Sequence, residues 1–148
     1  MIKKFTNFNE SKKYVDLISN FCKNSDLLKN NEYKTNSEKL NLIVSDNKNY
    51  YEIEITTLYR ADYKFNWHEI SKDFIELFKS INDNFGLCWV ATPKKYNYLA
   101  VFGYINNKGS VLTEAYTYDD IINDKVSNSP NVDNFHSIML MVSNNSNS

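Results

Sequence analysis

The sequence is poor in glycine and proline, with three and two residues among 148. Loops that cradle phosphate need several glycines at fixed spacing, because the backbone must turn tightly and approach the ligand closely. Gly86, Gly103 and Gly109 lie far apart and follow no such pattern. We therefore expect neither a P-loop nor a Rossmann dinucleotide turn, and we predict no cofactor.

Arginine is also scarce, since Arg60 is the one arginine among 17 basic residues. Proteins that read nucleic-acid sequence favour arginine, which pairs bidentately with guanine and phosphate. The lysines are scattered, and 17 basic against 18 acidic residues leave a formal net charge of −1. This balance creates no basic field, so we predict no nucleic-acid partner.

Cysteine and long apolar runs are equally limited. Cys22 and Cys88 each lie in an apolar stretch, outside any CxxC or Cys/His cluster with zinc spacing, so we expect buried, reduced thiols and no metal site. The longest apolar runs, 87–91 and 138–142, are far shorter than the roughly 20 residues that span a bilayer. The prediction is a cytoplasmic protein without membrane association.

The chain does contain enough apolar residues for a core, with 42% hydrophobic and 15% aromatic residues. It shows no repeat and no interdomain linker. We therefore predict a single domain over residues 1–142, followed by a polar, disordered tail over 143–148.

Two segments have the apolar periodicity of helices packed on one side. The stripe of the first, 9–28, consists of Tyr14, Leu17, Ile18, Phe21 and Cys22. The second begins at Asn66, a good N-cap with Glu69 three residues later, and Gly86 is placed to end it. The stripe of this second helix consists of Trp67, Ile70, Phe74, Leu77, Phe78 and Ile81.

Most other segments have strand patterns separated by turn residues. They are 40–44 and 51–55, a short strand at 87–92, the hairpin strands 96–105 and 110–118, and 135–142, with a short helix at 119–126 before the last strand. The order is α-β-β-α-β-β-β-α-β. It predicts the α+β class, with an antiparallel sheet of five or six strands backed by two main helices.

The hairpin 96–118 can be given a register by placing Gly109 in a bulge with positive φ, which pairs Asn106 with Ser110. One face then carries Tyr96, Tyr98, Ala100, Phe102, Tyr104, Leu112, Glu114, Tyr116 and Tyr118. The other carries Asn97, Leu99, Val101, Gly103, Ile105, Val111, Thr113, Ala115 and Thr117. The small side chains of the second face suit packing beneath a helix, so the tyrosine-rich face is predicted to point away from the helices.

An exposed tyrosine platform would bind a protein partner, because tyrosine offers a large contact area at low entropy cost. The predicted partner-binding residues are Tyr96, Tyr98, Phe102, Tyr104, Tyr116 and Tyr118. Two alternatives compete with this hypothesis. The tyrosine-rich face could itself be the core, with the threonine face wet, or the N-terminal segment with Phe5 and Phe8 could cover it.

Few residues suggest catalysis. His68 lies in the first turn of the second helix, where the helix dipole favours neutral imidazole, but no second ligand follows at helical spacing. Cys88, His136 and an aspartate could form a thiol triad, although the apolar surroundings of Cys88 argue against an activated thiol.

Acidic residues group at two further places. Glu52 and Glu54 share the wet face of a strand, where glutamate is usually solvated. Asp119, Asp120 and Asp124 could contribute to a cation site, but as acids at a helix start they need no ion. We assign none of them a catalytic or metal-binding role.

Together these observations predict a small cytoplasmic protein-binding module, such as a chaperone, adaptor, immunity protein or inhibitor, with another protein as its partner and a homodimer as a further possibility. Binding is favoured over catalysis. The alternatives are a small hydrolase or transferase using Cys88, His136 and His68, or a ligand-binding domain with a pocket between sheet and helix walled by Trp67 and Trp89.

Overall fold

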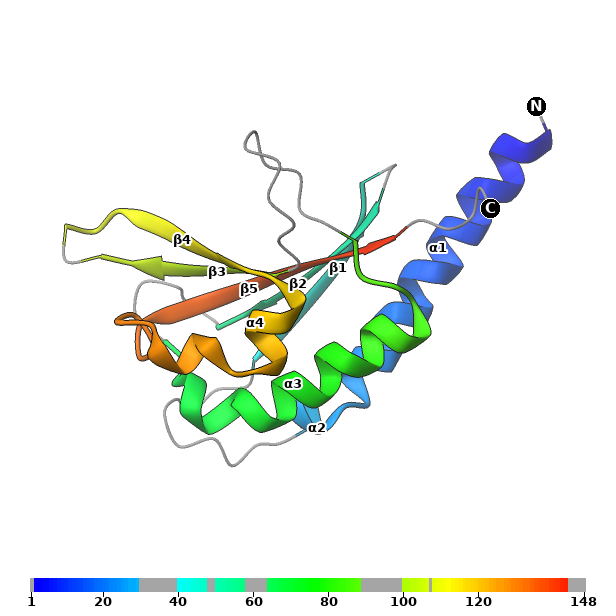
Figure 1. Cartoon of the computed structure of the whole chain (residues 1–148). Helices are drawn as coiled ribbons and strands as arrows, with labels where there is room; N and C mark the ends of the chain where they lie inside the picture. Colours follow the sequence, from blue (N-terminus) through cyan, green and yellow to red (C-terminus); the bar gives the residue numbers. More distant parts are fainter. Residues whose placement is uncertain are drawn as a thin grey trace.

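A computed structural model describes residues 2–29, 40–47, 50–57, 64–88, 100–106 and 108–143. The elements are α1 (Ile2–Lys23), α2 (Asp26–Lys29), β1 (Asn41–Asp46), β2 (Tyr50–Thr56), α3 (Trp67–Asn84), β3 (Ala100–Ile105), β4 (Val111–Tyr116), α4 (Tyr118–Ile122), the 3-10 helix η1 (Lys125–Asn128) and β5 (Phe135–Ser143). The five strands form one antiparallel sheet, and the two long helices α1 and α3 back it (Figure 1). The predicted fold class is confirmed.

The sheet has the order β1-β2-β5-β3-β4, so the last strand in sequence lies in the middle. It joins the hairpin β1–β2 to the hairpin β3–β4. The second hairpin has the predicted register, with Tyr104 opposite Leu112 and Phe102 opposite Glu114. Gly109 has a φ of 80°, which confirms the predicted turn.

Helix α3 begins and ends where the sequence predicts. The side chain of Asn66 accepts a hydrogen bond from the backbone N–H of His68 at 2.9 Å. At the other end, Gly86 has a φ of 82°, and its N–H donates to the carbonyl of Ile81 at 3.2 Å. A left-handed glycine of this kind terminates a helix without steric cost.

The first helix differs from its prediction at both ends. It starts at Ile2, earlier than expected, and it is interrupted at Asn24 and Ser25 before the short helix α2. The Ser25 hydroxyl donates to the carbonyl of Cys22 at 2.6 Å, which stabilises the break. Leu17, predicted in the buried stripe, is 54% exposed, although its neighbour Ile18 is fully buried.

Both long helices contact the same side of the sheet, called the inner face below. Tyr14 of α1 packs on Tyr51 of β2 with 4.8 Å between ring centroids, and it also touches Phe85 just after α3. The inner-face side chains of the three central strands are mostly fully buried: Ile53, Ile55, Ala100, Phe102, Ile138 and Leu140. The opposite side, called the outer face, has no described helix over it (Figure 1).

The segment after β4 is one helix in the prediction and two short ones in the structure. Thr117 and Asp120 form a capping box at the start of α4. Asp124 has a left-handed backbone with a φ of 54°, which separates α4 from η1. Among the described helices, none has both the length and the apolar character needed to cross a membrane.

The described part of the predicted strand 87–92 contributes only a bridge between Leu87 and Val142. Residues 89–92 lie outside the described residues, as do 144–148 of the predicted tail. Ser143 itself is the last residue of β5.

Candidate functional site

The described part of the tyrosine-rich face points toward the helices rather than away from them. Phe102 is fully buried, and its ring centroid lies 5.3 Å from that of Trp67 and 5.9 Å from that of Phe74 on α3. The predicted orientation is therefore wrong. The reason is that aromatic rings fill the space beneath α3 and bury more apolar area there than small side chains could. Thr113, on the opposite side of the hairpin, is exposed, as in the alternative that puts the tyrosine-rich face in the core.

Three tyrosines of the predicted site lie half-buried at the margin of the core. Tyr104 meets Phe135 edge to face at 6.3 Å, and Tyr118 packs against Phe78 at 5.3 Å. Tyr116 covers Phe102, also at 5.3 Å. These rings pack against the core and are not a free platform.

Tyr96 and Tyr98, also predicted in the site, lie outside the described residues. So do the side chains of Phe5 and Phe8, which one alternative placed over the tyrosines.

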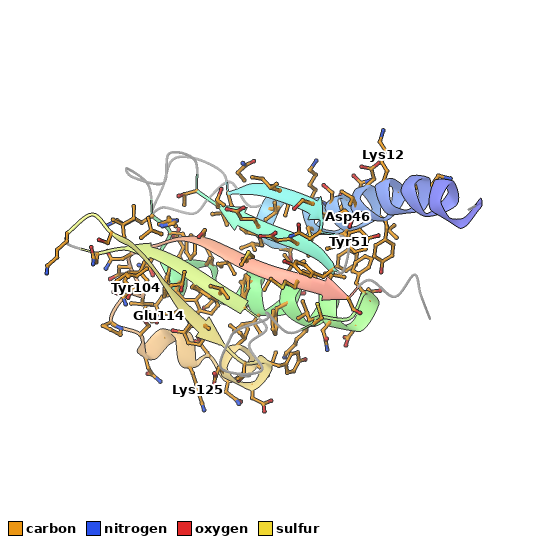
Figure 2. All side chains as sticks on the ribbon, turned by 90° about the horizontal axis from the view of Figure 1, so that it is seen from above. Lys12, Asp46, Tyr51, Tyr104, Glu114 and Lys125 are labelled. Atoms are coloured by element: carbon orange, nitrogen blue, oxygen red, sulfur yellow. The ribbon has the colours of Figure 1, made fainter. Side chains whose placement is uncertain are left out.

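Glu114 of β4 accepts hydrogen bonds from three different side chains. One oxygen accepts from the Tyr116 hydroxyl and from the Ser129 hydroxyl, both at 2.6 Å. The other accepts from Ser129 at 2.9 Å and from the Asn131 amide at 2.7 Å. Figure 2 places Glu114 and Tyr104 on neighbouring strands at the same end of the sheet. The network ties the loop before β5 to β4.

The same contacts change the acidity of this pair. Burial raises the pKa of Glu114, but hydrogen bonds from Ser129, Tyr116 and Asn131 outweigh burial, so the pKa lies below its usual value. The pKa of Tyr116 is raised by burial and by its bond to the carboxylate. Glu114 is therefore a charged carboxylate, and each of its oxygens accepts two hydrogen bonds from protein side chains. This arrangement suits a structural role.

Trp67 is fixed by a second carboxylate. Its ring is fully buried, and its Nε1–H donates to Asp124 at 2.6 Å. The other oxygen of Asp124 accepts from the Ser127 hydroxyl at 2.6 Å. The left-handed backbone of Asp124 thus brings its side chain to the start of α3.

An acidic cleft lies where the α1–α2 junction meets α3. It has a volume of about 350 Å³ and is lined by Phe21, Asn24, Ser25, Asp26, Asp73, Glu76, Leu77 and Ser80. Oxygens of Asp26, Asp73 and Glu76 all lie within 4.8 Å of one another. Carboxylates at this spacing concentrate negative charge, and Phe21 and Leu77 add an apolar wall.

Sequence reasoning missed this cleft. Asp73 and Glu76 are three residues apart on α3 and so share a helix face, a signal that was available. Asp26 is 47 positions before Asp73, and nothing in the sequence links the two. Hydroxyls and carboxylates of this kind bind cationic groups, but clusters of exposed acids are common without a ligand.

Three of the other acidic groups considered from the sequence have protein partners: Asp120, Asp124 and Glu52. Asp120 caps α4 and forms an ion pair with Lys125 at 3.5 Å, and Asp124 holds Trp67. Glu52 accepts from the Asn47 side chain at 2.9 Å. Neither set belongs to the acid cluster of the cleft.

The structure does not bring the candidate thiol triad together. The N–H of Cys88 donates to the carbonyl of Met141 at 2.9 Å, five residues along β5 from His136 and so about 17 Å away. Burial raises the pKa of the Cys88 thiol, the opposite of activation. His136 is 2% exposed and lies against Gly103, whereas His68 is exposed at the start of α3.

At Trp67, aromatic packing occupies the space between sheet and helix that was considered for a ligand pocket. The ring centroid of Trp67 lies 5.3 Å from those of both Phe74 and Phe102. Trp89, the other proposed wall, lies outside the described residues.

No protein-family model, curated protein or solved structure significantly matches the chain.

Proposed function

We propose that the protein is a small cytoplasmic protein-binding module, of the kind that serves as chaperone, adaptor, immunity protein or inhibitor. The binding surface is the outer face of the sheet. This replaces the tyrosine-rich face of the sequence-based hypothesis, because the described part of that face belongs to the core.

The observation that carries the proposal is one row of side chains across all five strands of the outer face. Following the strand register, this outer row consists of Ile43, Glu54, Met139, Val101 and Ala115. Ile43 is 46% exposed, and the others are half-buried. Four apolar side chains in register, three of them on adjacent strands, lie on a face with no described helix over it, and protein partners cover surfaces of this kind.

The row also suggests the chemistry of the partner. Glu54 lies in this row between Ile43 and Met139, and Glu52 lies two residues away on the same side of β2. A complementary surface would combine apolar side chains with lysine or arginine, which pair with carboxylates and steer association. The proposed partner is therefore a protein with a mixed apolar and basic patch.

The test replaces outer-face side chains without touching the core. Tagged wild type and the double variant Ile43→Lys with Met139→Gln are used to capture partners from native lysate, with quantification by mass spectrometry. The matched control is Leu17→Lys on α1, which changes a residue of similar exposure (54%). We expect one stoichiometric protein with wild type and Leu17→Lys, and its loss with a folded double variant. A partner retained by the double variant, or lost equally with Leu17→Lys, contradicts the proposal.

A further inference from the structure

β4 is one edge of the sheet, and its outward backbone groups can be identified. The N–H of Asn106 donates to the carbonyl of Ser110, so this pair is hydrogen-bonded. Bonded and non-bonded pairs alternate in an antiparallel ladder, so the next bonded residue of β4 is Leu112. The backbone groups of Val111, Thr113 and Ala115 therefore point away from β3. Within the described segments, no strand pairs with this edge.

This edge lacks the features that usually protect edge strands. Val111 is 65% exposed, Leu112 is 41% exposed, and the strand has no lysine, proline or bulge on its outer side. Its one charged residue, Glu114, is turned inward and bonded to Ser129. The β3–β4 hairpin reaches past the rest of the sheet, so a second strand could approach it (Figure 1).

We infer that two copies of this chain pair through β4, antiparallel, about a two-fold axis at Thr113. In this register Thr113 faces Thr113 of the second copy, and Val111 faces Ala115. These three pairings use every outward backbone group of β4 and form about six hydrogen bonds. Thr–Thr and apolar cross-strand pairs of this kind are favourable.

Charge complementarity indicates that the strand pairing with the edge of β4 is β4 of a second copy of the chain. The hairpin tip before β4 carries the exposed Lys108, and the exposed Asp119 follows β4 at the start of α4. Antiparallel pairing about Thr113 brings the tip of each copy beside the α4 start of the other. Lys108 and Asp119 thus form two symmetric opposite-charge contacts, one at each end of the interface.

The paired sheet would have the five strands of each copy, with the outer faces continuous. The inference does not depend on the proposed function, because the pairing uses backbone groups at the edge of β4 and the partner surface uses side chains of the outer row, with Ala115 common to both. One six-residue pairing is small beside a standard interface, so we expect a dissociation constant on the order of 100 μM.

Sedimentation velocity of the full chain from about 10 μM to 1 mM tests the pairing over this affinity range. Thr113→Pro removes a backbone N–H that points away from β3, so it breaks no hydrogen bond within the sheet. We therefore expect the variant to fold and its dimerisation to be weakened roughly tenfold or more. If circular dichroism shows that Thr113→Pro unfolds, Val111→Lys serves instead. A wild type that stays monomeric at 1 mM, or a dimer unaffected by the edge variant, overturns the inference.

Charge exchange tests the register. Lys108→Glu and Asp119→Lys should each weaken dimerisation about fivefold, and the double exchange should restore it. Lys12→Glu, on the exposed surface of α1, is the matched control and should have no effect. Failure of the double exchange to restore the dimer overturns the proposed register.

Discussion

Two acidic sites in the described part of the chain have carboxylates that lie in opposite surroundings. Around Glu114, one carboxylate meets three donor side chains, all within 2.9 Å. In the cleft between α2 and α3, oxygens of Asp26, Asp73 and Glu76 lie within 4.8 Å of one another. The first arrangement stabilises the charged form through hydrogen bonds, whereas the second brings like charges together.

The comparison shows that a group of polar residues does not define a functional site by itself. Glu114 has a depressed pKa, which is often taken as a sign of function, yet its partners account for it as a structural tie. The acids of the cleft carry the electrostatic cost of proximity, which any cationic group entering the cleft would relieve. The same substitution, glutamate to glutamine, should therefore have opposite effects at the two sites.

The largest effect is expected for Glu114→Gln. Glutamine keeps one acceptor oxygen but places an amide against the Asn131 amide, so at least one charge-assisted bond is lost. We expect a loss of about 2 kcal/mol in the free energy of unfolding, measured by urea denaturation. A loss below about 0.5 kcal/mol would show that the network is not stabilising.

The pH dependence of stability should identify the same group. Because the pKa of Glu114 is lower in the folded state than its ordinary value of 4.5, its contribution is complete above that value and is lost as pH falls through the folded pKa. The stability difference between wild type and Glu114→Gln should therefore shrink between pH 6 and pH 3. A constant difference across this range would assign the effect to packing instead of charge.

A smaller loss is expected for Asp124→Asn, near the same end of the sheet. Asparagine tolerates a left-handed backbone and keeps one acceptor, but it cannot accept equally from both Trp67 and Ser127. We expect about 1 kcal/mol of destabilisation in thermal unfolding. Red-shifted tryptophan emission would show that Trp67 has become more exposed to water. Unchanged emission together with unchanged stability would contradict the role of Asp124 in fixing Trp67.

The smallest effect, with the opposite sign, is expected for Glu76→Gln in the cleft. Removing one of the converging charges, three residues from Asp73 on the same helix, should raise stability by about 0.3 kcal/mol at low salt. The gain should vanish near 1 M salt, where the screening length is only about 3 Å. Destabilisation at low salt would show that Glu76 makes a favourable contact.

Local structure could be predicted well from this sequence. Asn66 and Gly86 correctly predict the two ends of α3. The turn residues Asn106 and Gly109 correctly predict both the turn and the strand register of the β3–β4 hairpin. Each of these signals is contained within a few neighbouring residues. The backbone conformation that each residue favours was enough to infer them.

The orientation of the hairpin could not be predicted in the same way. Side chains alternate between the two faces along a strand, so Phe102 and Val101 must lie on opposite faces of the sheet. The alternation does not say which of the two contacts α3, because that depends on the volume available between sheet and helix. The contacts of Glu114 with Ser129 and of Asp26 with Asp73 join positions 15 and 47 residues apart. Such contacts depend on the tertiary fold, and no local pattern encodes them.

The central position of β5 has a consequence for how the protein is made. Residues 135–143, the segment that lies between the two hairpins in the sheet, are synthesised after both of them. Until then, Ile53, Ile55, Ala100 and Phe102 have no neighbouring strand at the centre of the sheet. The two hairpins therefore cannot join into one sheet until β5 is available, so closure of the sheet follows the synthesis of the strand that is last in sequence.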